Sequence, residues 1–327
     1  MALKQRILQL LENSRGQALS GQQIADQLNV SRASVWKGVK ALQLEGYKII
    51  ATTNKGYILL ASNDILSEQS LRACLAPKYA DIDIVTLKTS PSTNAEAMTR
   101  LMSGQLRHGA LIVADEQTNG RGRMGKTFFS PKKGIYMSVS LCKRIENMQD
   151  VMVITPATAV ATRRSIAKLT GIDAKIKWVN DLYIGKKKVC GILTQADIDF
   201  ESGKAGTFII GIGINFVEQD FPDDIKDKAC ALFTGEPTIT RSQLIAEIYD
   251  NLITLTSDLT DRTFMQEYKE HSMVIGKEIS YVINCEDKRG RVIDIDNDGG
   301  LVIQEGDTTR KLTCGEISIR STENEWI

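Results

Sequence analysis

The pattern of hydrophobic residues changes twice along the 327-residue chain, and this limits the possible fold more than any single motif does. Residues 1–60 combine helical periodicity with two short strand-like runs, residues 65–270 alternate helical and strand patterns, and residues 274–327 are strand-like. Because a domain averages roughly 100–200 residues, a chain of this length holds two or three domains. The sequence therefore predicts an α+β multidomain protein with one domain in each of these three ranges.

Scarce residue types exclude several kinds of site. The chain has two histidines and six cysteines, and no two cysteines form a CxxC pair, so we do not expect a zinc site. Dispersed thiols instead indicate a reducing compartment. No apolar run reaches the roughly 18 residues of a membrane helix, and the charged, amphipathic N-terminus is unlike a secretory signal. We therefore expect a cytoplasmic protein with no membrane partner.

The charge of the chain is unevenly distributed. The formal net charge is +1, yet residues 1–60 carry eight basic and three acidic side chains, which is a net charge of +5. The remaining residues therefore hold 33 basic and 37 acidic side chains, a net charge of −4. A basic N-terminal segment attached to a mildly acidic body keeps nucleic acid open as a partner.

The basic segment has the pattern of a winged helix-turn-helix. Ser20 and Ser31 each precede a helical pattern, a tight turn at 29–30 separates the two patterns, and residues 47–60 read as a hairpin with a polar tip. In such a domain the helix that begins after Ser31 enters the major groove, and the wing contacts the DNA backbone. A small packing domain with a solvated charged face is the alternative, and the local charge favours DNA. The expected DNA contacts are Ser31, Arg32, Ser34, Lys37, Lys40 and Lys55.

A glycine- and arginine-rich segment, GRGRMGKT at residues 120–127, satisfies both the GxxxxGK[ST] and the GxGxxG patterns. Both motifs require a strand directly before the glycines and a helix directly after them. Here the six-residue stretch ADEQTN, five of whose residues are polar, separates the strand-like run at 110–113 from the glycines, and Pro131 and Gly134 follow. We therefore reject a P-loop and a dinucleotide fingerprint. The segment is expected to be a flexible loop whose arginines suit phosphate or carboxylate, with a solvated basic loop as the alternative.

Six motifs in this order resemble those of the biotin protein ligases. They are STN (92–94), EQTNGRGRMGK (116–126), KWVNDLY (177–183), KKVCGIL (187–193), GIGIN (211–215) and CGEISIRS (314–321). With the N-terminal helix-turn-helix, the chain is similar to the bifunctional (BirA-type) members, which are both biotin ligases and biotin operon repressors. The sequence departs from the usual motifs at three positions, with Met124 where arginine is common, Val179 where proline is common and Phe128 where tryptophan is frequent.

The resemblance and the strand pattern together imply the architecture. The central range, 65–270, is expected to be an α/β ligase domain with a mixed sheet of the class II synthetase type. Residues 274–327, with the turn signal DNDGG at 296–300, are expected to form a small SH3-like β-barrel.

The resemblance also implies a reaction in two steps. Biotin's carboxylate attacks the α-phosphate of ATP, supported by Mg²⁺, and gives biotinyl-5′-AMP and pyrophosphate. A lysine of the biotin carboxyl carrier domain of acetyl-CoA carboxylase then attacks the adenylate. No protein nucleophile is needed, which agrees with the scarcity of histidine. The adenylate is also expected to act as corepressor and to favour a homodimer on operator DNA. A ligand-sensing repressor with weakened ligase activity and a lipoate–protein ligase are the alternatives.

The same resemblance implies the residues of the site. Arg123 and Lys188 are the expected catalytic groups at the phosphate and carboxylate. Asp181 is expected to meet Mg²⁺ or the incoming lysine, and the metal arrives with ATP rather than at a dedicated protein site. The other expected biotin-binding residues are Ser92, Thr93, Asn94, Gln117, Arg121 and Gly122. The expected adenylate and phosphate loop consists of Gly120, Arg121, Gly122, Arg123, Gly125 and Lys126, together with Asn215.

Overall fold

The computed structural model divides the chain into two compact units, residues 1–81 with 239–246, and residues 82–238 with 247–327. Thr53 and Asn54 of the predicted hairpin tip, and residues 314–318 of the CGEISIRS motif, lie outside the described residues. The predicted domain boundaries stay a prediction. The structure describes residues 1–52, 55–142, 145, 147–199, 204–283, 286–313 and 319–321.

The first unit contains the helix-turn-helix and hairpin that the sequence predicts. The Ser20 hydroxyl accepts a hydrogen bond from the Gln23 amide at 3.1 Å, and Ser31 accepts one from the Ser34 amide at 3.2 Å, so both helices begin at a serine cap. Asn29 turns the chain between them with a φ of 54°. The elements are α1 (Leu3–Asn13), α2 (Gly21–Leu28), α3 (Arg32–Leu44) and the antiparallel strands β1 (Ile49–Thr52) and β2 (Gly56–Leu59). Their core includes Ile7, Leu11, Ile24, Val35, Val39, Leu42 and Leu59.

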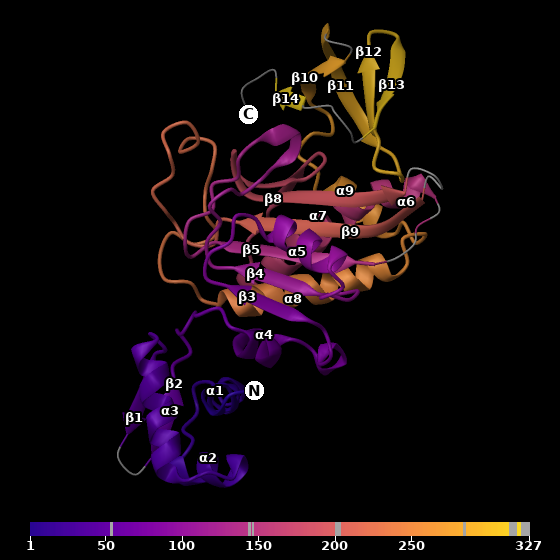
Figure 1. Ribbon diagram of the computed structural model, residues 1–327. Coiled ribbons are helices and arrows are strands. Elements are labelled where there is room, and N and C mark those ends of the chain that lie inside the picture. The colour runs from indigo at the N-terminus through magenta and orange to yellow at the C-terminus, as the bar shows by residue number, and fades with distance from the viewer. Residues whose placement is uncertain are drawn as a thin grey trace. The chain divides into compact units, whose positions relative to one another are not determined.

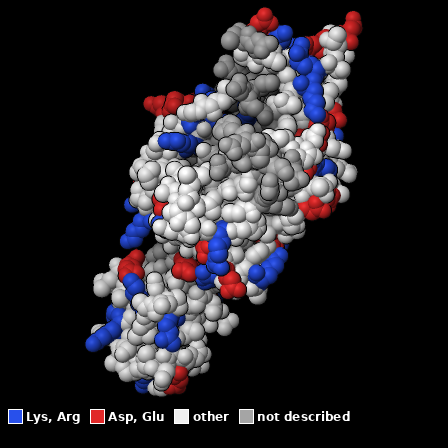
Figure 2. Space-filling model, turned by 45° about the vertical axis from the view of Figure 1, so that its right-hand side comes forward, with Lys and Arg blue, Asp and Glu red and all other residues white. Residues whose placement is uncertain are grey.

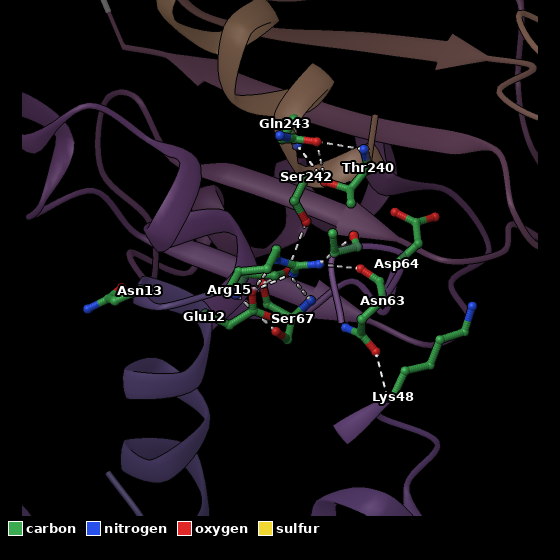
Figure 3. A network of polar contacts seen from close by, with 12 residues as sticks. Glu12, Asn13, Arg15, Lys48, Asn63, Asp64, Ser67, Thr240, Ser242 and Gln243 are labelled. Atoms are coloured by element: carbon green, nitrogen blue, oxygen red, sulfur yellow. Dashed lines mark hydrogen bonds and ion pairs between the residues drawn. The ribbon is translucent and has the colours of Figure 1, made fainter. Parts of the chain in front are cut away.

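Polar side chains connect this helix-turn-helix to the segment that follows it (Figure 3). Arg15 donates to the Asn63 carbonyl at 2.5 Å and to the Glu12 carboxylate at 3.0 Å through Nε. The Asn63 side-chain oxygen accepts from the Lys48 amide at 3.1 Å. Burial raises the pKa of the Glu12 carboxyl, while the neighbouring Arg15 acts in the opposite direction. The joint is therefore a bonded structure rather than a free tether.

The same segment is bonded to the beginning of α8 (Arg241–Ser257). Arg241 donates from its amide and from Nε to the two carboxylate oxygens of Asp64, each at 2.7 Å. Ser242 and Ser70 share a hydrogen bond of 2.9 Å. The segment also contains α4 (Glu68–Cys74) and the short helix η1 (Pro77–Tyr79).

The second unit is built on a seven-stranded mixed sheet, as predicted (Figure 1). Its strands lie in the order β3-β4-β5-β9-β8-β7-β6, with β3 and β4 parallel and the other neighbours antiparallel. The segment KIKWVND (175–181) has a strand-like pattern, but its strand ends at Lys177, because residues 178–180 form a turn. The bounds are β3 (Ile84–Leu87), β4 (Leu111–Ala114), β5 (Ile135–Leu141), β6 (Lys175–Lys177), β7 (Asp181–Ile184), β8 (Lys187–Asp199) and β9 (Lys204–Ile214).

Helices cover both faces of this sheet. Asn94 of α5 (Thr93–Met102) lies against Gly211 of β9, which pairs with Leu193 of β8. Thr155 of α7 (Ile154–Thr170) bonds to Thr194, the next residue of β8, at 2.8 Å. Successive strand residues point to opposite faces, so α5 and α7 lie on opposite sides of the sheet. The unit also contains α6 (Met148–Met152) and α9 (Phe264–Glu270). None of the helices described is long and apolar enough to cross a membrane.

The C-terminal part of the second unit is an antiparallel β domain. Its described strands lie in the order β13-β12-β11-β10-β14, and the described pairings do not join β13 to β14. The domain has its own core, which includes Ile279, Tyr281, Val292, Ile295, Leu301, Ile303 and Leu312. The strands are β10 (Glu278–Ile283), β11 (Glu286–Ile295), β12 (Leu301–Glu305), β13 (Thr308–Leu312) and β14 (Ile319–Ser321).

Candidate functional site

A cavity of about 750 Å³ lies over the central strands of the seven-stranded sheet. Its walls come from the start of α5, the β4–β5 loop, the β6–β7 turn, strands β8 and β9, and the loop after β9. The volume is within the range of a site for a small molecule or nucleotide. Of the predicted site residues, the cavity is lined by Ser92, Thr93, Asn94, Gln117, Arg121, Gly122, Arg123, Lys126, Asp181, Lys188 and Asn215.

Glycines in β8 and β9 form the floor of the cavity because other side chains lie directly on the sheet. A Cβ at Gly211 would lie 2.3 Å from the Asn94 side-chain oxygen, and one at Gly213 would lie 2.6 Å from the Phe128 ring. Gly191, which pairs with Gly213, lies beneath both Phe128 and Lys188. The absence of side chains here lets groups approach the backbone closely.

A buried polar cluster occupies one end of the cavity, at the start of α5. The Gln117 side-chain oxygen accepts from the Thr93 amide at 2.9 Å and from its hydroxyl at 3.2 Å, so Gln117 caps this helix. Ser92 is the N-cap residue by position, but its side chain makes no capping bond. Ser138 donates to the Asn94 side-chain oxygen at 2.6 Å. Neutral donors and acceptors fixed in this way suit a neutral polar ligand group.

The glycine- and arginine-rich segment folds back on itself between β4 and β5. Gly122 donates to the Lys126 carbonyl at 2.7 Å, and a one-turn 3₁₀ helix, η2 (Arg123–Gly125), forms the tip. Met124 adopts a φ of 55° there and is 61% exposed. Since neither a strand directly before nor a helix directly after the glycines is present in this described segment, the rejection of a P-loop is confirmed. Gly120 lies at the base of the loop and Gly125 at its tip.

Cationic groups from separate elements gather at the other end. Arg123 donates to the Asn180 side-chain oxygen at 3.4 Å, and Lys188 pairs with Asp181 at 2.7 Å. Lys188 Nζ also lies 5.8 Å from the centre of the Phe128 ring. With Arg121, Lys126, Lys177 and Lys228 also lining the cavity, its cations outnumber the lining carboxylates of Asp181 and Asp224. This charge suits a polyanionic ligand.

Sequence reasoning missed several lining residues. Four of them, Lys177, Trp178, Asn180 and Tyr183, belong to the KWVNDLY motif. The occurrence of this motif together with the others was the signal that could have identified them.

Burial raises the pKa of Tyr183, so this phenol stays neutral. Within the described parts of the chain, no group of three or more His, Cys, Asp or Glu side chains could hold a metal ion.

The loop after β9 forms a further wall. Asn215 donates from its side chain to the Cys230 carbonyl at 3.0 Å and thereby closes the loop at its base. Phe221 and Ile225 from this loop line the cavity. The rings of Phe221 and Phe129 meet edge to face at 6.2 Å, so this loop contacts the β4–β5 loop just after the glycine- and arginine-rich segment.

The predicted DNA-binding residues lie on the surface of the helix-turn-helix. Ser31, Arg32, Lys37 and Lys40 on or beside α3 and Lys55 at the hairpin are exposed. Ser34 is half-buried and bonds to Ser31. Trp36, on the same helix, is 53% exposed. Figure 2 shows Lys and Arg side chains at several separate places on the visible face of this domain.

Comparisons with known proteins agree with all three parts of the chain. The sequence profiles of an HTH domain, of the biotin/lipoate A/B protein ligase family and of the biotin protein ligase C-terminal domain match residues 4–58, 86–215 and 274–320. The bifunctional ligase/repressor BirA of Bacillus subtilis is 32% identical over 97% of this chain and 98% of its own length. The chain belongs to the BirA family of bifunctional ligase/repressors.

Another BirA and a solved biotin protein ligase also match this chain. BirA of Escherichia coli K12 is 25% identical over 97% of each chain. The biotin protein ligase from Aquifex aeolicus, solved in complex with biotin and ATP, is 24% identical and covers 73% of this chain and 99% of its own, with a TM-score of 0.62. That structure shows that this BirA-family chain shares the ligase fold.

Proposed function

We propose that this BirA-family protein is an ATP-dependent biotin–protein ligase that also acts as the repressor of a biotin operon. The observation that carries the proposal is the division of one cavity into a neutral amide end, at Thr93 and Gln117, and a cationic end, at Arg123 and Lys188. Biotin has a neutral ureido group and a carboxylate, and ATP brings further negative charge. The cavity therefore matches both reactants.

In the first step the biotin carboxylate attacks the α-phosphate of ATP, and pyrophosphate leaves. Both reactants are anions, and charge develops on the phosphate oxygens in the transition state. We assign Arg123 and Lys188 to these charges, with Arg121 and Lys126 on the loop, because preorganised cations lower such a barrier most directly. Mg²⁺ is proposed to enter with the triphosphate and to offset its charge.

In the second step a lysine of the biotin carboxyl carrier domain of acetyl-CoA carboxylase attacks the adenylate and releases AMP. The two loops joined through Phe129 and Phe221 are proposed to cover the adenylate, because the anhydride must be kept from water. Asp181 already contacts Lys188 Nζ at 2.7 Å, and we propose that it receives either Mg²⁺ or the incoming ammonium group.

The repressor role rests on the exposed basic residues of α3 and the hairpin. We propose that biotinyl-5′-AMP favours a homodimer, since two copies of a winged helix match a palindromic operator. Transfer of biotin to the carrier would consume the adenylate and relieve repression. The proposed domain ranges are 1–60, 65–270 and 274–327, with a class II synthetase-like centre, SH3-like closure of the last domain and a cytoplasmic location.

One assay tests the ligase proposal against its alternatives. The protein is incubated with ATP, Mg²⁺ and an apo carboxyl carrier domain, with either biotin or lipoate, and the carrier is probed with streptavidin or an anti-lipoate antibody. We expect biotin-dependent labelling that EDTA abolishes. Labelling with lipoate alone would identify a lipoate ligase, and adenylate binding without labelling would identify a sensor that has lost catalysis.

Lys188→Ala is expected to weaken biotin binding, because it removes the cation expected to meet the carboxylate. A charged hydrogen bond of this kind corresponds to about a tenfold or greater loss of affinity, measured by calorimetry. Lys186→Ala is the matched control, since Lys186 is exposed at the tip of the same hairpin. Equal affinities of the two variants would remove Lys188 from the biotin site.

A further inference from the structure

One wall of the cavity is bonded to the C-terminal β domain. Trp178 lines the cavity, is 4% exposed and donates its indole N–H to the Gly299 carbonyl at 2.9 Å. The lining residues themselves lie between Ser92 and Ala229, so Gly299 comes from outside that range. Gly299 belongs to the DNDGG turn between β11 and β12, which the proposed function has not used.

The turn has a defined structure centred on Asp296. One carboxylate oxygen of Asp296 accepts from the Asp298 amide at 3.0 Å and from the Gly300 amide at 2.8 Å, and the other pairs with Lys311. The Asp296 backbone accepts from the Gly299 amide at 3.0 Å. These bonds fix the direction of the Gly299 carbonyl.

The turn is also packed against the sheet's helices. Gly299 has a φ of +81°, and a Cβ there would lie 3.3 Å from Pro156 of α7. Beside it, the Tyr268 hydroxyl of α9 donates to the Val179 carbonyl at 3.1 Å in a buried bond. Hydrogen bonds with Gly299 and Tyr268 therefore fix the β6–β7 turn at two successive residues, Trp178 and Val179.

The adjoining residues, Asn180 and Asp181, contact the two proposed catalytic cations. Asn180 accepts from Arg123 at 3.4 Å and donates to the Ile192 carbonyl at 2.8 Å. Asp181 pairs with Lys188 at 2.7 Å. A shift of residues 178–181 would therefore move the partners of both proposed catalytic cations.

We propose that the DNDGG turn of the C-terminal domain is a positioning element for adenylate formation, acting through the Gly299–Trp178 hydrogen bond on Asn180, Asp181 and their cations. The proposal rests on the proposed ligase function. Trp178 and Gly299 are positioning residues, because they act through the β6–β7 turn rather than by supplying charge to the phosphate. The C-terminal domain thus contributes to the first step of the reaction.

The test compares Trp178→Phe, Gly299→Ala and the double variant in the full-length chain. Trp178→Phe removes the donor and keeps an aromatic ring, and Gly299→Ala displaces the carbonyl. Each is expected to lower the single-turnover rate of adenylate formation at saturating biotin and ATP about fivefold to twentyfold, the effect of one lost buried hydrogen bond. Biotin affinity by calorimetry should fall by a smaller factor than this rate, because the amide end of the cavity is untouched and Lys188 is still present to meet the carboxylate.

The double variant should be no slower than the slower single variant, because both substitutions remove one interaction. Gly306→Ala is the matched control, since Gly306 also has a positive φ (58°), lies in the next hairpin turn of the same domain, and has no atom within 4 Å of a Cβ placed there. Equal rates of adenylate formation in Gly299→Ala and Gly306→Ala would overturn the proposal. So would a rate loss in the double variant equal to the product of the two single losses. Trp178→Phe avoids backbone strain and keeps the test valid if Gly299→Ala fails to fold.

Failure of the ligase function would be recognised separately, because the wild-type chain would then form no adenylate. In that case the contact between Trp178 and Gly299 is tested by tryptophan fluorescence. The chain carries Trp36→Phe and Trp326→Phe, so that Trp178 is the tryptophan that remains. Gly299→Ala should shift its emission and Gly306→Ala should not. An unchanged emission would overturn the contact itself.

Discussion

Arg123→Ala is expected to lower the rate of adenylate formation by about 100-fold or more, the loss typical of removing one preorganised donor from a developing charge. Arg123 lines the cavity and bonds to Asn180 at 3.4 Å, but it is not part of the buried core, so the fold should persist. The measurement is pyrophosphate release with biotin and ATP, with thermal unfolding as a check of the fold. Arg123→Lys should recover part of the rate, because it restores the charge without the planar fork.

Lys132→Ala is the matched control for this experiment. Lys132 is an exposed cation of the same β4–β5 loop and does not line the cavity, so its removal should leave pyrophosphate release unchanged. Near-normal release by Arg123→Ala would remove this arginine from the chemistry. An equal loss in both variants would point to the general charge of the loop instead.

The second large effect is expected in DNA binding. Replacing Arg32 and Lys37 together by glutamate should weaken operator binding about 100-fold or more, because two expected phosphate or base contacts become repulsive. Both side chains are exposed on α3, so the buried core of the helix-turn-helix is unaffected. A gel shift with the biotin operon region, at several salt concentrations, measures the change in affinity. The slope of log affinity against log salt concentration should become less steep.

A charge-matched variant, Lys133→Glu with Arg289→Glu, is the control. Both residues are exposed and lie outside the helix-turn-helix, so the net charge changes equally while the proposed DNA surface stays intact. Adenylate formation should be unaffected in either variant. If the control lost DNA binding to the same extent, the interaction would depend on net charge rather than on α3.

Local patterns predicted where two helices begin but not where every strand ends. The serine caps at Ser20 and Ser31 and the alternating pattern of IYMSVSL, which forms β5, are local signals, and the structure confirms them. The strand-like pattern of KIKWVND continues beyond Lys177, whereas the strand itself stops there. What ends it is non-local, because Gly299 and Tyr268 hold residues 178 and 179 from behind.

For the candidate site, too, the sequence predicted some features and the structure alone shows others. The order of motifs brought Gln117, Arg123 and Lys188 into one hypothesis, and the structure brings them to one cavity. That Gln117 rather than Ser92 caps α5 was invisible in the sequence, since the two partners are 24 residues apart. Lys228 of the loop after β9 was not among the expected residues for the same reason.

By itself the sequence determined the order of three domain types, the uneven charge of +5 and −4, and the residue types expected at the site. These properties depend on composition and on neighbours along the chain. The tertiary structure alone decided which groups meet, including the Asp181–Lys188 pair, the glycine floor beneath Phe128 and the bond from Trp178 to Gly299. Such contacts join residues far apart in the chain, and only the packing of strands and helices fixes their distances.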